Sequence, residues 1–256
     1  TDFNFKDKFS KFLFFKKPNL IRTLGKAANL KKLNSADILV ATTNAYGLAL
    51  ARLHASGVLT TRVAFLPMGI LDLGADSAQK ASVKEILENV LSLVISKNEA
   101  DYLHAQFPDI KERIVYLSFG IDTAYWQPGS LPASSYILTI GNDRNRDYEM
   151  LVRAWKSSYP ELRIITKRKI EEPLPANVKV FAGDWRGQLF SDDDIRSIMR
   201  ESLFGIIPLR NTIQPAGQSA CLQMMACGKA VVLSNIDGLW DADVMRAGET
   251  CLLPQP

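Results

Sequence analysis

The sequence is poor in the residues from which disulfide frameworks and metal centres are built. Its 256 residues include three cysteines, Cys221, Cys227 and Cys251, and two histidines, His54 and His104. Three cysteines cannot pair completely, none stands in a C-x-x-C or Cys/His cluster, and the two histidines lie far apart. We therefore expect no disulfide framework, no metal site and no metal-dependent catalytic centre. Unpaired thiols favour an intracellular protein.

Long apolar runs are also missing. No window approaches the ~18–20 uninterrupted apolar residues of a membrane span, and the chain does not open with a signal-peptide pattern. A composition of 47% apolar and 23% charged residues is instead ordinary for a globular protein. At this length we expect one large domain or two small ones.

Positive charge is concentrated in the first 35 residues. They contain nine basic and two acidic residues, a balance of +7, whereas the remaining 221 residues carry 22 basic and 25 acidic ones, a balance of −3. Six phenylalanines are interleaved with these lysines: Phe3, Phe5, Phe9, Phe12, Phe14 and Phe15. Residues 1–35 are therefore a candidate for binding an anionic membrane surface. The alternative, a helix packed by its phenylalanines with lysines in solvent, remains open.

After residue 35, short apolar runs alternate with helical patterns. Residues 36–43 (ADILVATT) are apolar and rich in β-branched residues, and a helical pattern follows and stops at Gly57. Strands that are apolar throughout and alternate with helices indicate parallel strands covered on both faces. The sequence thus predicts an α/β fold of the doubly wound type.

Residues 122–135 form the best linker, because they contain two prolines, a glycine and serines. Beyond them the alternation of strands and helices restarts. We predict a first domain at residues 1–127 and a second at residues 135–256. The first domain has few strand–helix units and no glycine-rich opening turn, so we expect it to be incomplete in this chain.

Two arginines follow the first predicted strand of the second domain. The strand runs into Gly141 and Asn142, then Arg144 and Arg146, before a helix that starts near Asp147. In open α/β sheets, ligands bind beyond the carboxyl ends of strands. Two guanidiniums there suit a diphosphate, since each offers a forked set of donors to phosphate oxygens. The alternative is a solvated charged turn.

A second loop follows the predicted strand that ends near Pro208. It contains Pro215, Ala216 and Gly217, and a helix starts at Gln218 and Ser219. Gly217 allows a close backbone approach, and free N–H groups at the helix start favour an anion. Gln223, about one turn further on, could bind a ribose diol. The alternative is a small-residue turn that only permits packing.

A third turn carries Gly183, Asp184 and Trp185 after another predicted strand. Gly183 could supply a backbone edge and Trp185 a flat face near a nucleobase. A buried structural tryptophan is the alternative.

The motifs of residues 136–254 resemble the nucleotide-sugar-binding domain of GT-B glycosyltransferases, most of all retaining glycosyltransferase family 4. The matching stretches are ILTIGNDRNRDYEMLVRAW, VKVFAGD, IIPLR, PAGQSACLQMMACGKAVVLSNIDGL and GETCLLP. The first domain matches more loosely, through ADILVATT, VLSLVISKNEADYL and IVYLSFGIDTAYWQP. The resemblance implies a GT-B architecture, in which two Rossmann-like doubly wound domains face a cleft.

The resemblance also implies roles for individual residues. Arg144 and Arg146 take the place of the family's basic pair at the donor diphosphate, and we treat them as the catalytic residues. Gln223 takes the place of the second Glu of the family's Glu pair, which holds the ribose hydroxyls. The remaining donor-binding candidates are Gly141, Asn142, Gly183, Asp184, Ala216, Gly217, Gln218 and Ser219.

Two departures from the family pattern bear on the mechanism. Pro215 stands where the family has the first Glu of its pair, so a carboxylate near the sugar is missing. Residues 65–69 (FLPMG) stand where many members have a histidine.

The function implied is transfer of a sugar from a nucleoside-diphosphate sugar, UDP-sugar being favoured over GDP-sugar, to an acceptor hydroxyl. The acceptor would be a glycan or a lipid-linked molecule, the outcome retention, and the process polysaccharide or glycolipid synthesis. Fixed positive charge would stabilise the leaving diphosphate without a metal or cofactor. Asp192, Asp193 and Asp194 are predicted to start a helix rather than to bind a cation.

Two other function classes remain open. One is a non-catalytic nucleotide-sugar-binding protein, which the missing Glu and His favour, and the other is a GT-B nucleotide-sugar epimerase. We expect no nucleic-acid partner, because no recognised motif accompanies the basic segment. The expected location is the cytoplasm, with the basic segment allowing peripheral attachment to the inner face of the membrane.

Overall fold

The computed structural model describes residues 19–129, 135–182 and 190–256. By its internal contacts the chain divides into two compact units, Thr1–Ser118 and Phe119–Pro256. The first half of the basic, phenylalanine-rich segment lies outside the described residues, so its role at a membrane stays a prediction. None of the described helices is long and apolar enough to cross a membrane.

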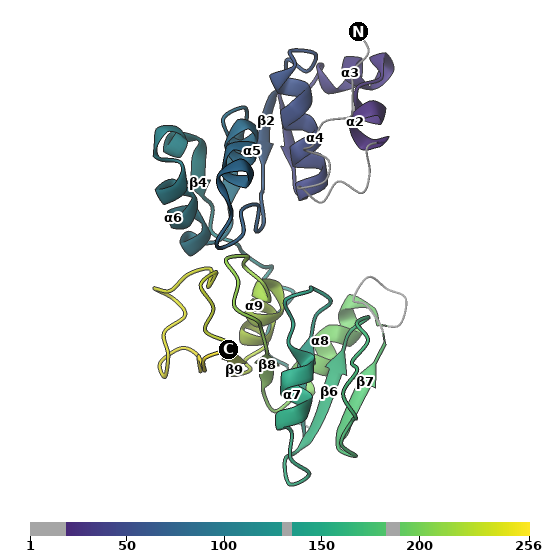
Figure 1. Ribbon diagram of the computed structural model, residues 1–256. Helices are drawn as coiled ribbons and strands as arrows, with labels where there is room; N and C mark the ends of the chain where they lie inside the picture. Colours follow the sequence, from purple (N-terminus) through teal and green to yellow (C-terminus); the bar gives the residue numbers. More distant parts are fainter. Residues whose placement is uncertain (1–18, 130–134, 183–189) are drawn as a thin grey trace. The chain divides into compact units, whose positions relative to one another are not determined.

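The first unit is a parallel four-stranded sheet with strand order β1-β2-β3-β4 (Figure 1). Helices connect consecutive strands, which confirms the predicted α/β alternation. The strands are β1 (Ile38–Ala41), β2 (Arg62–Phe65), β3 (Leu91–Val94) and β4 (Ile114–Tyr116). The helices are α2 (Asn19–Leu24), α3 (Ala27–Leu33), α4 (Asn44–Ala55), α5 (Ser77–Leu87), α6 (Lys97–Gln106) and the 3₁₀ helix η1 (Pro108–Arg113).

Local chemistry places the helix boundaries. At α5, the side chain of Asp76 accepts from the Gln79 N–H, and the Gln79 side chain accepts from the Asp76 N–H, both at 2.8 Å. This capping box satisfies two donors that a helix start otherwise leaves unpaired. Helix α6 ends at Gln106, just before Pro108, which lacks the N–H needed to continue it.

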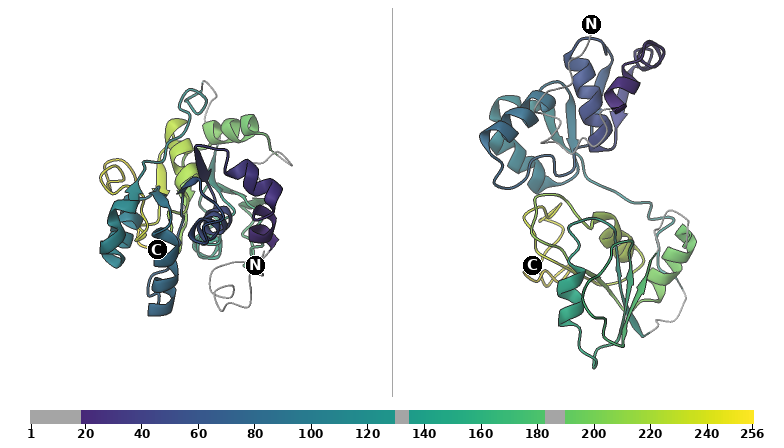
Figure 2. Two further views of the ribbon diagram at one scale, coloured as in Figure 1. Left: turned by 90° about the horizontal axis from the view of Figure 1, so that it is seen from above. Right: turned by 45° about the vertical axis from the view of Figure 1, so that its right-hand side comes forward.

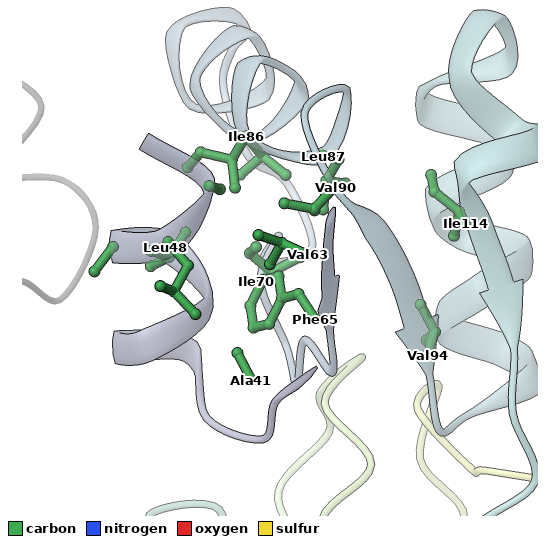
Figure 3. Close-up of a cluster of buried hydrophobic side chains, with 14 of the residues drawn as sticks. Ala41, Leu48, Val63, Phe65, Ile70, Ile86, Leu87, Val90, Val94 and Ile114 are labelled. Carbon is green, nitrogen blue, oxygen red and sulfur yellow. The ribbon is translucent and has the colours of Figure 1, made fainter. Parts of the chain in front are cut away.

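The core of the first unit lies on one face of its sheet. Val63 and Phe65 point from β2 toward Leu48 of α4 and Ile86 of α5, and Val94 of β3 lies further along the sheet, near Ile114 of β4 (Figure 3). Burying one such side chain stabilises the fold by roughly 1.5–3 kcal/mol.

The other face of this sheet differs from the expectation of helices on both sides. Ile38 and Val40 of β1, Leu91 of β3 and Val115 of β4 are 40–57% exposed within the described part of the chain. The physical reason is the strand order. Parallel crossovers have one hand, so a sheet that always adds its next strand at the same edge places all its helices on one face.

The second unit is a parallel five-stranded sheet with strand order β7-β6-β5-β8-β9. The strands are β5 (Tyr136–Ile140), β6 (Glu161–Ile165), β7 (Val178–Phe181), β8 (Gly205–Ile207) and β9 (Val231–Leu233). The helices are α7 (Tyr148–Ala154), α8 (Asp192–Glu201) and α9 (Gln218–Ala226). Ser191 and Asp194 form a capping box at α8, so Asp192, Asp193 and Asp194 do start a helix, as predicted.

Helices cover both faces of this second sheet, which makes the unit doubly wound. Tyr148 and Leu151 of α7 pack with Leu162 in one core, whereas Met199 of α8 and Met224 of α9 lie in another. Figure 2 shows the helices of this unit on both sides of its strands. The direction of winding reverses between β5 and β8. Such a reversal is the place where open α/β sheets bind ligands.

The division between the units falls earlier than the predicted linker. Trp126 is buried in the core of the second unit, the Tyr125 hydroxyl donates to Asp193 of α8 at 2.8 Å, and Arg200 Nε donates to the Gln127 carbonyl at 2.7 Å. Residues 119–127, which the sequence placed with the first domain, therefore pack with the second. The buried ring of Trp126 holds these residues against the second unit, although the residues that follow it have the composition of a linker.

Candidate functional site

The two predicted loops meet at the reversal point of the second sheet. The loop after β5 (residues 141–147) and the loop after β8 (residues 208–217) exchange backbone hydrogen bonds. Asp147 N donates to Pro208 O at 3.0 Å, and Arg210 N donates to Asn145 O at 2.9 Å. Segments more than sixty residues apart in sequence thus form one surface at the carboxyl ends of β5 and β8.

Arg146 is the central residue of this surface. It is 3% exposed, and its guanidinium lies against two glycines. A Cβ built on Gly141 would lie 2.2 Å from Arg146 Nε, and one built on Gly217 would lie 3.0 Å from Arg146 Nη1. The two glycines therefore make room for the guanidinium. The solvated-turn alternative is wrong for Arg146, whereas Arg144 is exposed.

Arg146 is only partly neutralised. Its Nε lies 2.9 Å from Asp143 Oδ2, in an ion pair that lacks hydrogen-bond geometry. Its Nη1 is buried and has no hydrogen-bond partner among the described residues. Burying a polar group without a partner is unfavourable, and burying part of a cation more so. The site is therefore suited to an additional anion.

Gly217 is also the N-cap of α9. Its φ of 81° lies in the left-handed region, and no side chain caps the helix. The first N–H groups of a helix have no acceptor within it, and the helix dipole places partial positive charge there. The first helical hydrogen bond, from Cys221 N to Gly217 O, measures 3.0 Å. Arg146 and the start of α9 thus provide positive charge side by side.

The neighbouring candidates take different positions. Ala216 and Gln218 are buried, while Ser219 is exposed and Gln223 is half-buried. Residues four apart share a helix face, so Ser219 and Gln223 lie on the same side of α9. The predicted ribose contact of Gln223 stays a prediction.

Asn142 has a structural role. Its Oδ1 accepts from Lys167 N at 2.6 Å and from Thr166 Oγ1 at 3.3 Å, which ties the loop after β5 to the segment after β6. Gly141 O accepts from the Tyr148 hydroxyl at 2.7 Å. Burial raises the pKa of Tyr148, so the hydroxyl stays protonated as this donor. Gly183, Asp184 and Trp185 lie outside the described residues.

The three cysteines, Cys221, Cys227 and Cys251, are free, buried thiols, and Cys221 lies in the first turn of α9. Burial, followed by the proximity of Cys251, raises the pKa of Cys221 to about 12, although Arg146 opposes the shift. A thiol with so high a pKa is not a nucleophile at neutral pH. Within the described ranges, no group of three or more His, Cys, Asp or Glu side chains could hold a metal ion.

Two further arginines contact the loop after β5 or the start of α7, and the sequence did not predict either of them as a site residue. Arg168 donates to carbonyls of the loop after β5, and Arg210 forms ion pairs with Asp147 at 3.4 Å and Glu149 at 3.3 Å. The available signal was position: Arg168 follows the end of β6 as Arg144 follows the end of β5. This position was not enough to predict the role of Arg168, because every residue has a backbone carbonyl and the sequence does not indicate which carbonyls a side chain will contact.

In the first unit, residues 65–69 are held by side chains from two helices. Asn44 donates to Met68 O at 2.9 Å and accepts from Met68 N at 3.1 Å. Glu99 Oε1 accepts from Gly69 N at 2.7 Å. Burial raises the pKa of Glu99 to about 8, although hydrogen bonds from the backbone of Gly69 and Ile70 act in the opposite direction. The carboxyl of Glu99 is therefore protonated at neutral pH.

A cavity of about 90 Å³ lies beside this segment, between α4 and α5. Asn44 and Gln79 line it, but their side chains are already engaged by Met68 and Asp76. We assign no ligand to it.

No family model matches this chain, and no curated protein sequence matches it. Solved structures do resemble it. Sucrose-phosphate synthase from Thermosynechococcus elongatus superimposes with a TM-score of 0.69 at 18% identity, covering 94% of this chain and 67% of that one. HepE from Anabaena, in complex with UDP-glucose, gives 0.66 at 14% identity, covering 90% and 68%. Trehalose-phosphate synthase (UDP-forming) from Burkholderia vietnamiensis gives 0.60 at 8% identity, covering 92% and 67%.

All three are glycosyltransferases of the GT-B class, and this chain has the same α/β fold. The fold expected from the sequence motifs is therefore confirmed. Identities this low concern the fold alone, and membership of family 4 in particular stays a prediction.

Proposed function

We propose that this chain is a glycosyltransferase that moves a sugar from a nucleoside-diphosphate sugar to an acceptor hydroxyl. The observation that carries the proposal is the buried guanidinium of Arg146, with its unpartnered Nη1, at the uncapped start of α9. A diphosphate supplies the missing charge and acceptors, because guanidinium–phosphate hydrogen bonds are strong and directional. Its position at the reversal point of the sheet agrees with ligand binding in open α/β folds.

The favoured donor is a UDP-sugar. The resemblance of the second unit's motifs to nucleotide-sugar-binding domains supports a nucleoside diphosphate, and the structural neighbour HepE was solved with UDP, with UDP-glucose, and with UDP and glucose. Gln223 would hydrogen-bond the ribose hydroxyls from the exposed side of α9. A GDP-sugar is the alternative donor.

The chemistry asks little of the protein beyond fixed positive charge. Sugar transfer breaks the bond between the anomeric carbon and the diphosphate oxygen and forms a bond from that carbon to the acceptor oxygen. Negative charge develops on the leaving diphosphate, which takes up the proton of the acceptor hydroxyl. Arg146 and the N–H groups at the start of α9 are preorganised to stabilise that charge. Arg144, exposed in the same loop, would contact the outer phosphate oxygens. We propose that the reaction proceeds with retention and needs neither metal nor cofactor.

A non-catalytic nucleotide-sugar-binding protein is the second candidate. Pro215 favours it, since it is buried at the position where the family has a carboxylate near the sugar. The two candidates share the nucleotide site and differ only in turnover.

The acceptor and the location follow from the basic opening segment. We propose a glycan or lipid-linked acceptor, a role in polysaccharide or glycolipid synthesis, and a cytoplasmic protein held at the inner face of an anionic membrane. The +7 balance of residues 1–35 supports this, because each basic residue near such a surface adds about 1 kcal/mol of attraction.

Calorimetric titration with UDP, GDP and ADP tests the nucleotide site. We expect wild type to bind UDP, and Arg146→Met to weaken binding roughly 10- to 100-fold, the loss of about 1.5–3 kcal/mol from a charged hydrogen bond. Arg146→Lys keeps the charge and guards against a folding defect. Arg153→Met is the matched control, since Arg153 is exposed on α7 and pairs with Glu172 at 2.6 Å.

A second test uses the double variant Arg144→Ala with Arg146→Ala. If this variant binds UDP as tightly as wild type, the two arginines do not bind the phosphates. Release of UDP from a panel of UDP-sugars, with and without glycan and lipid-linked acceptors, then separates the two candidates. Binding without release in every combination favours the non-catalytic protein.

A further inference from the structure

Arg168 makes an unusual set of contacts. Its Nη1 donates to three backbone carbonyls of one short loop: Asp143 O at 3.0 Å, Arg144 O at 2.8 Å and Arg146 O at 2.7 Å. Arg168 lies just after β6 and is half-buried. The loop it contacts lies after the neighbouring strand β5 and carries both arginines of the proposed phosphate site.

The segment around Arg168 is itself anchored. Arg168 N donates to Thr166 Oγ1 at 3.1 Å, and Thr166 Oγ1 in turn donates to Asn142 Oδ1 at 3.3 Å. Lys167 N donates to the same Asn142 oxygen at 2.6 Å. The guanidinium therefore projects from a backbone that is fastened to the start of the loop it holds.

Three carbonyls turned toward one nitrogen fix the loop backbone. A peptide unit is planar, so holding its oxygen also sets the direction of the N–H on the other side of the plane. The carbonyls of residues 143, 144 and 146 belong to three of the five peptide units between Asp143 and Tyr148. The positions from which the side chains of Arg144 and Arg146 project are thereby determined.

The fixed loop matters because Arg146 has almost no room to move. Its guanidinium fits between Gly141 and Gly217, where built Cβ atoms would lie 2.2 Å and 3.0 Å from it. A shift of the loop by one ångström would drive it into a neighbour or withdraw it from the start of α9. The energy of a charged hydrogen bond depends steeply on such distances.

We propose that Arg168 is a positioning residue of the nucleotide site, which holds the loop after β5 so that Arg144 and Arg146 meet the phosphates, and does not bind the nucleotide itself. This inference rests on the proposed function. It assigns a role to a residue that no motif of the sequence singled out.

The test compares UDP with uridine, because the ratio of their dissociation constants isolates the phosphate contribution. In Arg168→Met, we expect UDP binding to weaken roughly tenfold or more while uridine binding stays within about twofold. A merely structural defect would weaken both ligands equally. Arg168→Lys should restore most of the difference, since an ammonium group offers three N–H donors where the guanidinium Nη1 offers two.

Amide hydrogen exchange of residues 142–147 in the ligand-free protein provides the second measurement. Arg168→Met should raise exchange there, with little change elsewhere in the second unit. Lys169→Met is the matched control. Lys169 belongs to the same segment but is exposed, and its side chain pairs with the exposed Glu171 at 3.0 Å.

The outcomes separate the two proposals. If wild type binds UDP and Arg168→Met keeps the full difference between UDP and uridine, the positioning role is overturned and the proposed function stands. If Arg168→Met lowers the difference without changing loop exchange, Arg168 binds phosphate directly, and the positioning role is again overturned. If wild type binds no nucleoside diphosphate, both proposals fall, whatever the exchange data show.

Discussion

Arg146 and Gly217 come from loops after different strands. The guanidinium of Arg146 occupies the space that a side chain at position 217 would fill. A Cβ on Gly217 would lie 3.0 Å from Arg146 Nη1 and 2.6 Å from Ile207 Cγ2. The glycine also has a φ of 81°, which side chains disfavour. The glycine at the start of α9 thus leaves the space that the guanidinium of Arg146, from the loop after β5, occupies.

Gly217→Ala should therefore weaken UDP binding and lower stability. The left-handed backbone costs about 1–2 kcal/mol, and the contact with Ile207 adds to it. Gly248→Ala is the matched control, because Gly248 has a φ of 78° and nothing within 4 Å of its built Cβ. We expect both variants to melt earlier in thermal denaturation, and Gly217→Ala alone to lose nucleotide affinity. Equal affinity in the two variants would contradict the assigned geometry.

Glu99 should make stability depend on pH. Burial raises the pKa of Glu99 to about 8, above its value in the unfolded chain. The folded state thus holds a proton that the unfolded state releases near pH 4.5. The stabilising contribution is complete below that pH, falls as pH rises, and is lost by about pH 8, with a slope of up to about 1.4 kcal/mol per pH unit.

The variant Glu99→Gln keeps the shape and the acceptor for Gly69 N–H but does not titrate. Urea unfolding between pH 5 and 9 should show wild type losing stability relative to this variant as pH rises. The difference between the two curves isolates Glu99 from all other titrating groups. Parallel curves across this range would show that the carboxyl titrates normally.

Gly47→Ala should destabilise the first unit. A Cβ on Gly47 would lie 2.0 Å from a ring carbon of Phe65, so α4 packs directly on β2 at this point. Alanine gains about 1 kcal/mol of helix propensity, but overpacking a tight contact typically costs 1–3 kcal/mol and no rotamer change of alanine relieves it. We expect a lower melting temperature with UDP affinity unchanged, because the proposed nucleotide site lies in the second unit.

A second substitution tests the cause. Phe65→Leu removes ring atoms at the contact and should recover part of the loss when combined with Gly47→Ala. Gly120→Ala, at an exposed glycine without a left-handed φ and with no neighbour within 4 Å of its built Cβ, controls for the general effect of adding a methyl group. Purely additive losses in the double variant would mean that the contact with Phe65 is not the reason.

Much of the fold could be predicted from local pattern. Apolar runs alternating with helical periodicity indicated the strands and helices of both units. The start of α8 at its capping box and the end of α6 before Pro108 also depend on local chemistry. The loops that carry Arg146 and Gly217 could be selected as well, because ligands bind at the carboxyl ends of parallel strands. Motifs then connected these loops to the GT-B fold.

Other features were outside the reach of local pattern. Whether the helices of the first unit cover one face or two depends on strand order, and Ile38 and Val40 are exposed for that reason. Residues 119–127 resemble a linker, yet Trp126 packs into the second core. Each outcome depends on which distant segment becomes a neighbour.

What the sequence by itself determined about this protein is the alternation of strands and helices, the two α/β units and the basic residues at the ends of particular strands. Only the tertiary structure decided that Arg146 is buried while Arg144 is exposed, that Gly141 and Gly217 enclose its guanidinium, and that Arg168 holds the loop from a neighbouring strand. The physical reason is that periodicity and capping act within a few residues, whereas burial, charge pairing and carbonyl contacts arise where strands distant in sequence come together in one sheet.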